Sequence, residues 1–298
     1  MRKENQENNL KNKKKIGTLF VVSTPIGNLK DITVRAIEVL NGVDLIAAED
    51  TRTTKKLLQA YTIKSRLISY REENRERITP VIIGELLSGS DCALTADAGT
   101  PAISDPGFYL IDRCVENGID IVPIPGPSAI TASLVASGID PSTFVFWGFL
   151  PKRGAKRKKI LEQIKNDEKT SVFFESPARI ISTLSELRSE IGERKISLCR
   201  ELTKIHEEVI RGNIDDVIKK LEERGKIKGE IVIVVSGKQH IKRNYDDDEV
   251  EGEINRIMKR YRDKSTKEIA TIVSEKLKLP GSRVYRKIIQ MKNNQKID

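Results

Sequence analysis

The sequence is poor in the side chains that bind transition metals, with only 3 cysteines and 2 histidines among 298 residues. Cys92, Cys114 and Cys199 are far apart and form no Cys-x-x-Cys pair, so we expect neither a zinc cluster nor a disulfide framework. Each cysteine lies in an apolar segment and is predicted to be a small, buried hydrophobic side chain. The chain is therefore expected to bind no metal.

Long hydrophobic runs are also missing, since the longest candidates, such as residues 231–235, have only the length of a strand. A helix that crosses a bilayer needs about 18 successive apolar residues. Residues 1–15 are polar and lack the apolar core of about 7–15 residues that a signal peptide contains. These absences predict a cytoplasmic protein with no membrane partner. The length favours two domains with room for a small third.

The formal net charge of +10 is distributed unevenly along the chain. Residues 1–15 carry a net +4, residues 151–159 carry +6 and residues 254–298 carry +9, so the remainder is acidic. Basic segments of this kind are typical of a surface that binds the phosphates of a nucleic acid. For residues 1–15 we prefer the alternative, a disordered basic extension. In residues 151–159 six cations repel one another unless a polyanion neutralises them, which favours nucleic-acid binding.

Over residues 16–123, short β-branched runs alternate with amphipathic stretches, which predicts an α/β domain with a mostly parallel sheet covered by helices, and a second α/β unit follows it. The expected strands are 18–23, 43–48, 66–69, 92–95, 119–123, 144–148, 171–174, 195–200 and 230–235. The expected helices are 32–40, 53–60, 75–87, 107–117, 128–137, 155–165, 178–191 and 214–223.

Changes in composition predict the domain boundaries. Three prolines at positions 123–127 separate an N-terminal α/β domain (16–124) from a C-terminal α/β domain (125–240). The acidic stretch at 241–253 indicates a solvated linker or the start of a helix, and we predict a linker. Residues 254–298 contain two short helical patterns around a Pro-Gly pair, which predicts a small helical domain resembling a helix-turn-helix.

Polar motifs follow several of the predicted strands. Residues 95–107 form the densest one, at the carboxyl end of a strand, where α/β sheets bind ligands. In it, Asp97 can accept hydrogen bonds from ligand hydroxyls, and Gly99 permits close approach of the backbone. Residues 23–29 form a glycine turn that matches neither Gly-x-Gly-x-x-Gly nor a P-loop. The mixed charges of residues 199–204 at another strand end are typical of a polar site.

With these motifs the chain resembles the tetrapyrrole-methylase superfamily and, within it, the 16S ribosomal RNA (cytidine-2′-O)-methyltransferases. The resemblance covers about residues 16–236 and rests on STPIGNLKDIT (23–33), AEDTR (48–52), DAGTP (97–101), SDPG (104–107), PGPSA (125–129), FWGFLP (146–151), FESPAR (174–179) and CRELTK (199–204). It implies two α/β domains with S-adenosylmethionine in the cleft between them, and a homodimer. The implied substrate is the ribose of a cytidine in the decoding region of the 16S rRNA of the small ribosomal subunit.

The resemblance further implies that loops of both domains contact the cofactor. From the first domain these residues are Pro25, Asp97, Ala98, Gly99, Thr100, Pro101, Ser104 and Asp105. From the second they are Ser128, Ala129, Trp147, Gly148, Phe149, Arg200, Glu201, Leu202, Thr203, Glu230 and Ile231. A sulfonium cofactor needs neither a metal nor a redox group, in agreement with the few cysteines and histidines.

Transfer of a methyl group to a ribose 2′-oxygen depends on orientation, which can contribute about 7–11 kcal/mol. A base that removes the hydroxyl proton adds typically about 10²–10⁴-fold. Asp50, with Glu49 beside it, follows a predicted strand on the side expected to meet the substrate, and is the candidate base. The alternative is that Asp50 only caps the helix that follows it.

The predicted RNA contacts are Arg52, Lys152, Arg153, Lys156, Arg157, Lys158, Lys159, Arg283, Arg286 and Lys287. Two other functions stay open at this point. A small-molecule tetrapyrrole methylase would share the fold, but it leaves the basic residues 151–159 without a role. A ligand-sensing regulator that binds nucleic acid through residues 254–298 leaves the motifs at 48–52 and 199–204 unexplained.

Overall fold

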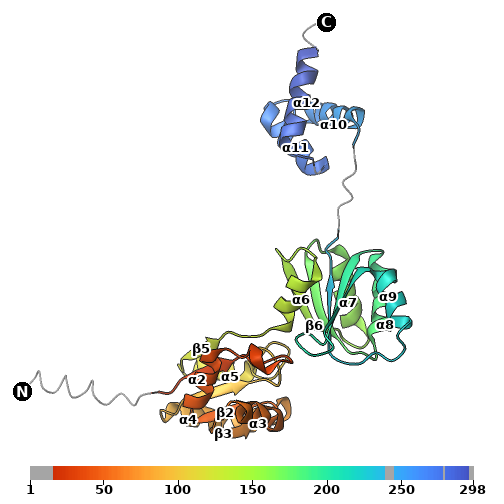
Figure 1. The fold of residues 1–298 in the computed structure, drawn as a ribbon. Helices are drawn as coiled ribbons and strands as arrows, with labels where there is room; N and C mark the ends of the chain where they lie inside the picture. The colour runs from red at the N-terminus through yellow and green to blue at the C-terminus, as the bar shows by residue number, and fades with distance from the viewer. Residues whose placement is uncertain (1–15, 239–244, 278, 295–298) are drawn as a thin grey trace, which may run out of the picture. The chain divides into compact units, whose positions relative to one another are not determined.

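The computed structural model describes residues 16–238, 245–277 and 279–294. The chain divides into two compact units, one that ends at Lys238 and one that contains the helices from residue 245 onward. The first unit holds two sheets flanked by helices (Figure 1). Within the described ranges, no helix is long and apolar enough to cross a lipid bilayer.

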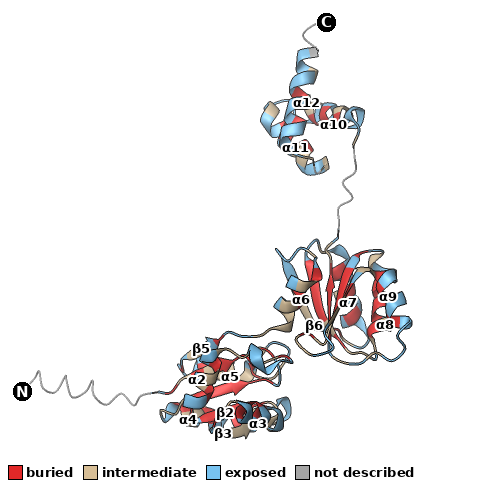
Figure 2. Cartoon of the chain, in the orientation of Figure 1, coloured by how far each residue is buried: buried red, intermediate tan, exposed pale blue. Residues whose placement is uncertain are grey.

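The first sheet has five parallel strands in the order β3-β2-β4-β1-β5. Its strands are β1 (Leu19–Val22), β2 (Leu45–Ala48), β3 (Arg66–Ser69), β4 (Cys92–Thr95) and β5 (Ile121–Ile124). Every residue of β2 and β4 is buried, as expected for central parallel strands covered on both faces. Figure 2 shows this buried layer between helices whose outer faces are exposed.

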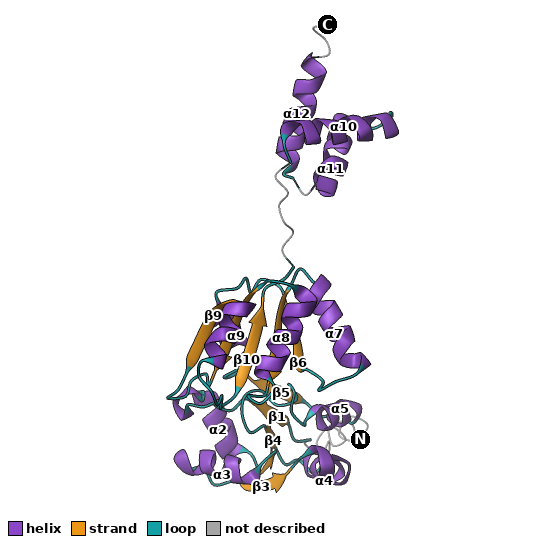
Figure 3. Ribbon diagram, turned by 90° about the vertical axis from the view of Figure 1, so that its right-hand side faces the viewer, coloured by secondary structure: helices purple, strands orange, loops and turns teal. Residues whose placement is uncertain are grey.

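Helices cover both faces of the first sheet (Figure 3). The elements are α2 (Val34–Gly42), α3 (Thr51–Ala60), α4 (Arg75–Leu87) and α5 (Phe108–Glu116), with short 3₁₀ turns η1 (Leu29–Asp31) and η2 (Glu72–Asn74). Leu40 of α2 and Leu58 of α3 belong to the core on one face. Ile82 of α4 and Leu110 of α5 belong to the core on the other. The loops after β1, β2 and β4 are therefore left at the carboxyl edge of the sheet, where such folds bind ligands.

The second sheet is mixed, with the order β6-β7-β10-β8-β9. Its strands are β6 (Phe144–Phe149), β7 (Thr170–Glu175), β8 (Lys195–Arg200), β9 (Glu208–Asn213) and β10 (Ile231–Val235), and its helices are α6 (Ala129–Ser137), α7 (Ala155–Asn166), α8 (Ile180–Ile191) and α9 (Ile214–Glu222). β6 pairs in parallel with β7, and the other pairs are antiparallel. Helices α7, α8 and α9 cover one face through Leu161, Leu184 and Val217. Helix α6 covers the other face through Leu134.

The predicted strands and helices of residues 16–235 match observed ones, but strand β9 was not predicted. Its residues alternate poorly, because Glu208, Arg211 and Asn213 interrupt the apolar positions. The strand forms because every one of its residues pairs with the predicted strand β8. The boundary predicted at 124–125 falls between β5 and α6.

The second unit contains helices α10 (Asp247–Arg260), α11 (Thr266–Leu277) and α12 (Gly281–Asn294). The prediction of an acidic linker over 241–253 is wrong in its described part, because residues 247–253 form the first turns of α10. Asp246 caps that helix by accepting a hydrogen bond from the Glu249 backbone amide at 2.7 Å. Val250 and Ile254 of α10 are buried in the core of this unit. The prediction that the helical domain starts at residue 254 is also wrong, because α10, which begins at Asp247, belongs to that domain.

Candidate active site

Two strand-end loops of the first sheet are joined directly to each other. Thr24, after β1, and Gly99, after β4, form an isolated bridge with reciprocal backbone hydrogen bonds of 2.9 and 3.0 Å. Gly99 has a φ of +83°, a conformation that favours glycine. The Ser23 and Thr100 hydroxyls lie 2.9 Å apart beside this bridge. The motifs at 23–29 and 97–101 therefore form one rigid wall.

The glycine turn of the first of these loops packs closely on the second α/β part. A Cβ atom on Gly27 would lie 2.4 Å from Lys204 Cγ and 2.9 Å from Thr203 Oγ1. Only glycine allows this approach, so the motif at 23–29 fits against the motif at 199–204. Ile26 of the same turn is buried in the core that also contains Leu202. The two sheets are held together by this contact.

A cavity of about 670 Å³, the large cavity, lies between the two α/β parts. Its size is typical of a site for a small molecule or cofactor. The residues that line it are Ile26, Ala98, Gly99, Thr100, Ile103, Ser104, Asp105, Ser128, Ala129, Ile130, Thr131, Phe144, Phe146, Phe149, Phe174, Glu175, Ser176, Pro177, Gly229, Glu230, Ile231 and Val232.

The large cavity is mostly apolar and partly aromatic. The Phe174 ring packs against the rings of Phe146 and Phe149, with centroid distances of 5.0 and 5.3 Å. Phe149 is 58% exposed and Ile103 is 46% exposed. Apolar side chains gathered in a cavity and left open to water favour a ligand with a flat apolar part.

The large cavity contains about half of the predicted cofactor residues. Those that line it are Ala98, Gly99, Thr100, Ser104, Asp105, Ser128, Ala129, Phe149, Glu230 and Ile231. Those that do not line it are Pro25, Asp97, Pro101, Trp147, Gly148, Arg200, Glu201, Leu202 and Thr203. Phe146 and Phe174 also line the cavity and were not predicted to do so, although they belong to the motifs FWGFLP and FESPAR.

Trp147 is excluded from the cavity by the alternation of a strand. Its ring packs against the core on the other side of the sheet, and its indole N–H donates to Ser171 Oγ at 3.1 Å. The pairing of β6 with β7 shifts register between Phe146 and Phe149. This irregularity lets Phe146 and Phe149 both face the cavity while Trp147 points away from it.

Arg200 and Glu201 support the wall of the cavity instead of lining it. Glu201 Oε1 accepts hydrogen bonds from the Glu230 backbone amide and from Lys204 Nζ, each at 2.9 Å. Arg200 Nη1 donates a hydrogen bond to the Lys228 carbonyl, shortly before β10, at 3.2 Å. These contacts fix the turn after β8 to the start of β10, from which Glu230 and Ile231 reach the cavity.

Asp105 is the cavity residue with the most unusual electrostatics. Burial, and then the negative charges of Glu49 and Asp97, raise the pKa of its carboxyl group to about 7. Within the described part of the chain, its side chain makes no hydrogen bond or ion pair. This unpaired carboxyl group could bind a cationic ligand, because a positive charge beside it would favour its ionised form.

Asp50 caps α3, so the alternative interpretation of this residue is confirmed. Its Oδ1 accepts a hydrogen bond from the Arg52 backbone amide at 2.9 Å, and its Oδ2 lies 2.7 Å from Arg52 Nη2. Hydrogen bonds from the Arg52 side chain and backbone hold the pKa of Asp50 well below its usual range. A carboxylate held in this way is a weak base, which argues against the catalytic role predicted for Asp50. Burial raises the pKa of Glu49.

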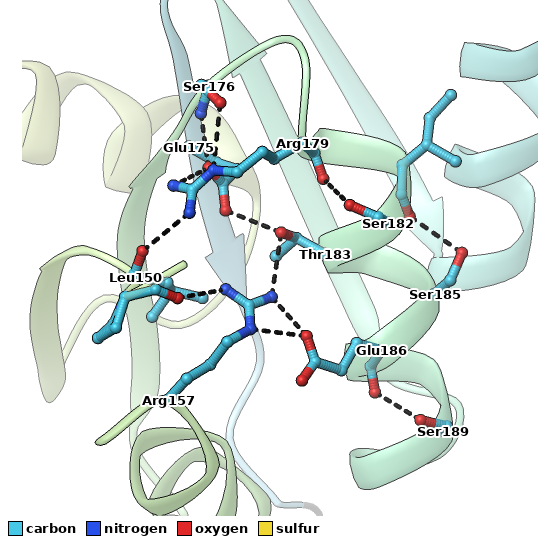
Figure 4. Close-up of polar contacts among 12 residues, drawn as sticks. Leu150, Arg157, Glu175, Ser176, Arg179, Ser182, Thr183, Ser185, Glu186 and Ser189 are labelled. Atoms are coloured by element: carbon cyan, nitrogen blue, oxygen red, sulfur yellow. Dashed lines mark hydrogen bonds and ion pairs between the residues drawn. The ribbon is translucent and has the colours of Figure 1, made fainter. Parts of the chain in front are cut away.

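A network of ion pairs and hydrogen bonds starts at Glu175, which lines the large cavity (Figure 4). Glu175, whose side chain is fully buried, pairs with Arg179 at 2.5 Å and accepts a hydrogen bond from Thr183 Oγ1 at 2.8 Å. Thr183 Oγ1 accepts in turn from Arg157 Nη2 at 3.2 Å. Arg157 Nε donates to Glu186 Oε2 at 2.7 Å. The network joins the FESPAR motif to helix α7.

The prediction that Arg157 contacts RNA is contradicted by this network, because its side chain is only 7% exposed and is fully paired. Its neighbours Lys156 and Lys158 are exposed. The remaining predicted RNA contacts of this segment, Lys152, Arg153 and Lys159, are also exposed. Of the six cations at 151–159, five are therefore available to a partner.

The other predicted RNA contacts differ in how free they are. Arg52 is 84% exposed but paired with Asp50. In the second unit, Lys287 is paired with Asp247 at 3.0 Å and Glu251 at 2.8 Å, and Arg283 lies 3.5 Å from Asp247. Arg286 is exposed, and its Nε donates to the Ser282 carbonyl of its own helix. Over the described ranges, no group of three or more His, Cys, Asp or Glu side chains could hold a metal ion.

A model of the tetrapyrrole (corrin/porphyrin) methylases matches residues 18–218 of this chain. The chain belongs to that family. The range matched by the family model includes every strand of the two sheets except β10. It also includes the motifs between residues 23 and 204 on which the resemblance rests.

Several relatives bear the name ribosomal RNA small subunit methyltransferase I. The protein of Thermotoga maritima is 46% identical over 224 residues, which cover 75% of this chain and all of the relative. That of Halalkalibacterium halodurans is 46% identical over 221 residues, covering 74% and 76%. That of Synechocystis is 39% identical over 280 residues, covering 93% and 99%.

Solved structures of more distant proteins share the fold. Diphthine synthase aligns with a TM-score of 0.61 at 13% identity, over 75% of this chain and 92% of that one. Cobalt precorrin-4 methyltransferase, a cobalamin biosynthetic enzyme, aligns with a TM-score of 0.57 at 15% identity, over 74% and 94%. These likenesses support the architecture of two α/β parts.

Proposed function

We propose that this protein is an S-adenosylmethionine-dependent methyltransferase that modifies the ribose 2′-hydroxyl of a cytidine in 16S rRNA of the small ribosomal subunit. The large cavity between the two α/β parts carries this proposal, because its lining residue Phe149 is followed closely in sequence by a run of exposed cations. The names of the relatives support ribosomal RNA as the substrate. A ribosomal substrate also favours the cytoplasm as the site of action.

The residues of the large cavity fit S-adenosylmethionine, which supplies a methyl group on a positively charged sulfur. Phe146, Phe149 and Phe174 offer apolar faces to a flat purine ring. The Asp105 carboxyl group offers a negative charge to the cationic part. The rigid loops after β1 and β4 fix the orientation of whatever they hold, which is the main requirement for a transfer in line.

The basic segment that follows β6 supports RNA as the macromolecular partner. Lys152, Arg153, Lys156, Lys158 and Lys159 are exposed close in sequence to Phe149, which lines the large cavity. Backbone phosphates can be neutralised by such lysines without any reading of sequence. The helical unit is proposed to add further phosphate contacts through residues such as Arg286. The homodimer implied by the resemblance stays a prediction.

The test is incubation of the purified protein with labelled S-adenosylmethionine and small ribosomal subunits that lack the modification, followed by nuclease mapping. We expect the label in one cytidine of 16S rRNA, in a linkage that resists alkaline cleavage because its 2′-oxygen is methylated. Large subunits serve as the matched control and should stay unlabelled. Label on a base, or on a tetrapyrrole in place of RNA, would contradict the proposal.

A further inference from the structure

A second cavity, the small cavity, is lined in part by Thr24 of the Thr24–Gly99 bridge. It has a volume of about 170 Å³ and is lined by the same two loops together with helix α3. Its residues include Pro25, Leu29, Leu57, Thr53, Lys56 and Asp97. Neither the cofactor proposed for the large cavity nor the contacts of the basic segment account for it.

Asp97 is held in one orientation at the edge of the small cavity. Its Oδ1 accepts a hydrogen bond from the Asp50 backbone amide at 3.0 Å, and its own backbone amide donates to Glu49 Oε2 at 3.2 Å. Among the residues that the structure describes, no group donates a hydrogen bond to its Oδ2. One carboxylate oxygen of fixed position is thus available to a ligand that brings a donor.

The other walls suit a flat ring. Pro25, Leu29 and Leu57 are apolar, and Lys56 adds an exposed cation that makes no ion pair with a described residue. The small cavity has room for a single pyrimidine ring but not for a whole nucleotide. Enzymes that do chemistry on a base take that base out of the stack and hold it in a snug pocket, and a pocket of this kind would fix the position of the attached ribose as well.

We propose that the small cavity binds the base of the target cytidine, with Asp97 accepting a hydrogen bond from its exocyclic amino group. This inference rests on the proposed function. Lys56 can donate to the ring nitrogen or the carbonyl oxygen of the same base. Since the loops at 23–29 and 96–99 line both cavities, a sugar attached to a base held there lies beside the large cavity.

The arrangement selects cytidine over uridine. Cytosine presents an amino donor to the Asp97 carboxylate, as in the known pairing of acidic side chains with that group. Uracil presents a carbonyl oxygen at the same position, so that two acceptors would face each other and the carboxylate would lose its partner. Specificity for cytidine would then reside in Asp97, and Asp97 would belong to the substrate site, not to the cofactor site.

The experiment compares Asp97→Asn with the unaltered protein on two kinds of small subunit, with cytidine or with uridine at the mapped position. The asparagine amide has the same shape and can donate to the uracil oxygen. We expect the ratio of kcat/KM for cytidine over uridine to fall by at least about five-fold, the lower limit for one base-reading contact. Affinity for S-adenosylmethionine, measured by calorimetry, should change by less than two-fold.

Asp105→Asn is the matched control, because it removes a carboxylate from the large cavity. It should weaken binding of S-adenosylmethionine while the preference for cytidine stays the same. A second variant, Thr53→Phe, fills the small cavity from its exposed edge. It should retain affinity for the cofactor and lose methylation of either subunit.

The outcomes separate this inference from the proposed function. Methylation by Asp97→Asn with an unchanged cytidine preference would overturn the base pocket and leave the methyltransferase intact, as would normal turnover by Thr53→Phe. Loss of cofactor binding by Asp97→Asn would also overturn the inference, because it would show that Asp97 contacts the cofactor. If the unaltered protein labels no ribosomal RNA, the proposed function itself fails, and the base pocket with it.

Discussion

Replacing Arg157 with alanine is expected to destabilise the first unit, although this residue stands in the middle of a basic run. Its guanidinium donates to Glu186 Oε2 at 2.7 Å, to the Pro151 carbonyl at 2.9 Å and to Thr183 Oγ1 at 3.2 Å. Alanine would leave these acceptors without a donor. Since the Arg157 side chain is only 7% exposed, water replaces it poorly.

The magnitude follows from the exposure of the two partners. Removing one member of a buried ion pair destabilises a protein by about 3–5 kcal/mol. Glu186 is 38% exposed, so water solvates part of its charge after the loss of Arg157, and about 2–3 kcal/mol is the better value. At about 2–4 °C per kcal/mol for a unit of this size, the midpoint of thermal unfolding should fall by roughly 4–12 °C.

The assay is thermal unfolding followed by circular dichroism, with Lys158→Ala as the matched control from the same turn of α7. Lys158 is exposed, so its loss should change stability by no more than about 0.5 kcal/mol. The reasoning is refuted if both variants unfold at the same temperature. It is also refuted if Arg157→Ala keeps its stability but binds RNA less tightly, because Arg157 would then contact the RNA.

Three further predictions concern the proposed ligands. Replacing Lys156, Lys158 and Lys159 with serine should weaken RNA binding. The slope of log affinity against log salt concentration should become shallower by roughly 0.7–0.9 per lost phosphate contact. An unchanged slope in filter binding would show that these lysines do not contact RNA phosphates. Since the pKa of Asp105 is raised to about 7 and a cation prefers the carboxylate, affinity for S-adenosylmethionine should rise with pH between about 6 and 8. That rise should be absent in Asp105→Asn, and calorimetry showing the same rise in both proteins would contradict the assignment. A chain ending at Lys238 should still fold and bind the cofactor, because the helical unit has its own core, but should show a higher KM for small subunits; an unchanged KM would mean that the helices do not contact the RNA.

Much of the fold could be predicted from the sequence because most strands are short apolar runs bounded by polar turns. β9 escaped because its stability comes from pairing with β8 and not from its own pattern. Helix α10 escaped because its acidic residues dominate the composition, whereas Val250, Ile254 and Ile257 recur at the spacing of a buried helical face. That spacing is visible in the sequence and predicts a helix in place of the linker.

The candidate site was predicted less completely, for reasons that are also physical. The resemblance identified motifs as blocks, but only alternate residues of a strand face one side, so Trp147 points away from the cavity that holds Phe149. Arg157 lies four residues before Leu161 and seven before Ile164, on the buried face of α7. This helical spacing was a signal that one cation of the run is internal. Which oxygen of Asp97 stays available depended on contacts across strands and could not be read from sequence.

The network of Glu175, Arg179, Thr183 and Arg157 fixes the backbone that connects the large cavity to the basic segment. Arg179 Nη1 donates to the Leu150 carbonyl at 3.3 Å, and Arg157 Nη1 donates to the carbonyl of Pro151, the next residue. Phe149, just before them, lines the large cavity, and the exposed cations begin just after them. An RNA held by those cations is therefore positioned relative to the cavity by a fixed backbone. Because orientation is the main demand of methyl transfer, cations at this place would both bind the proposed RNA substrate and fix its position relative to the large cavity.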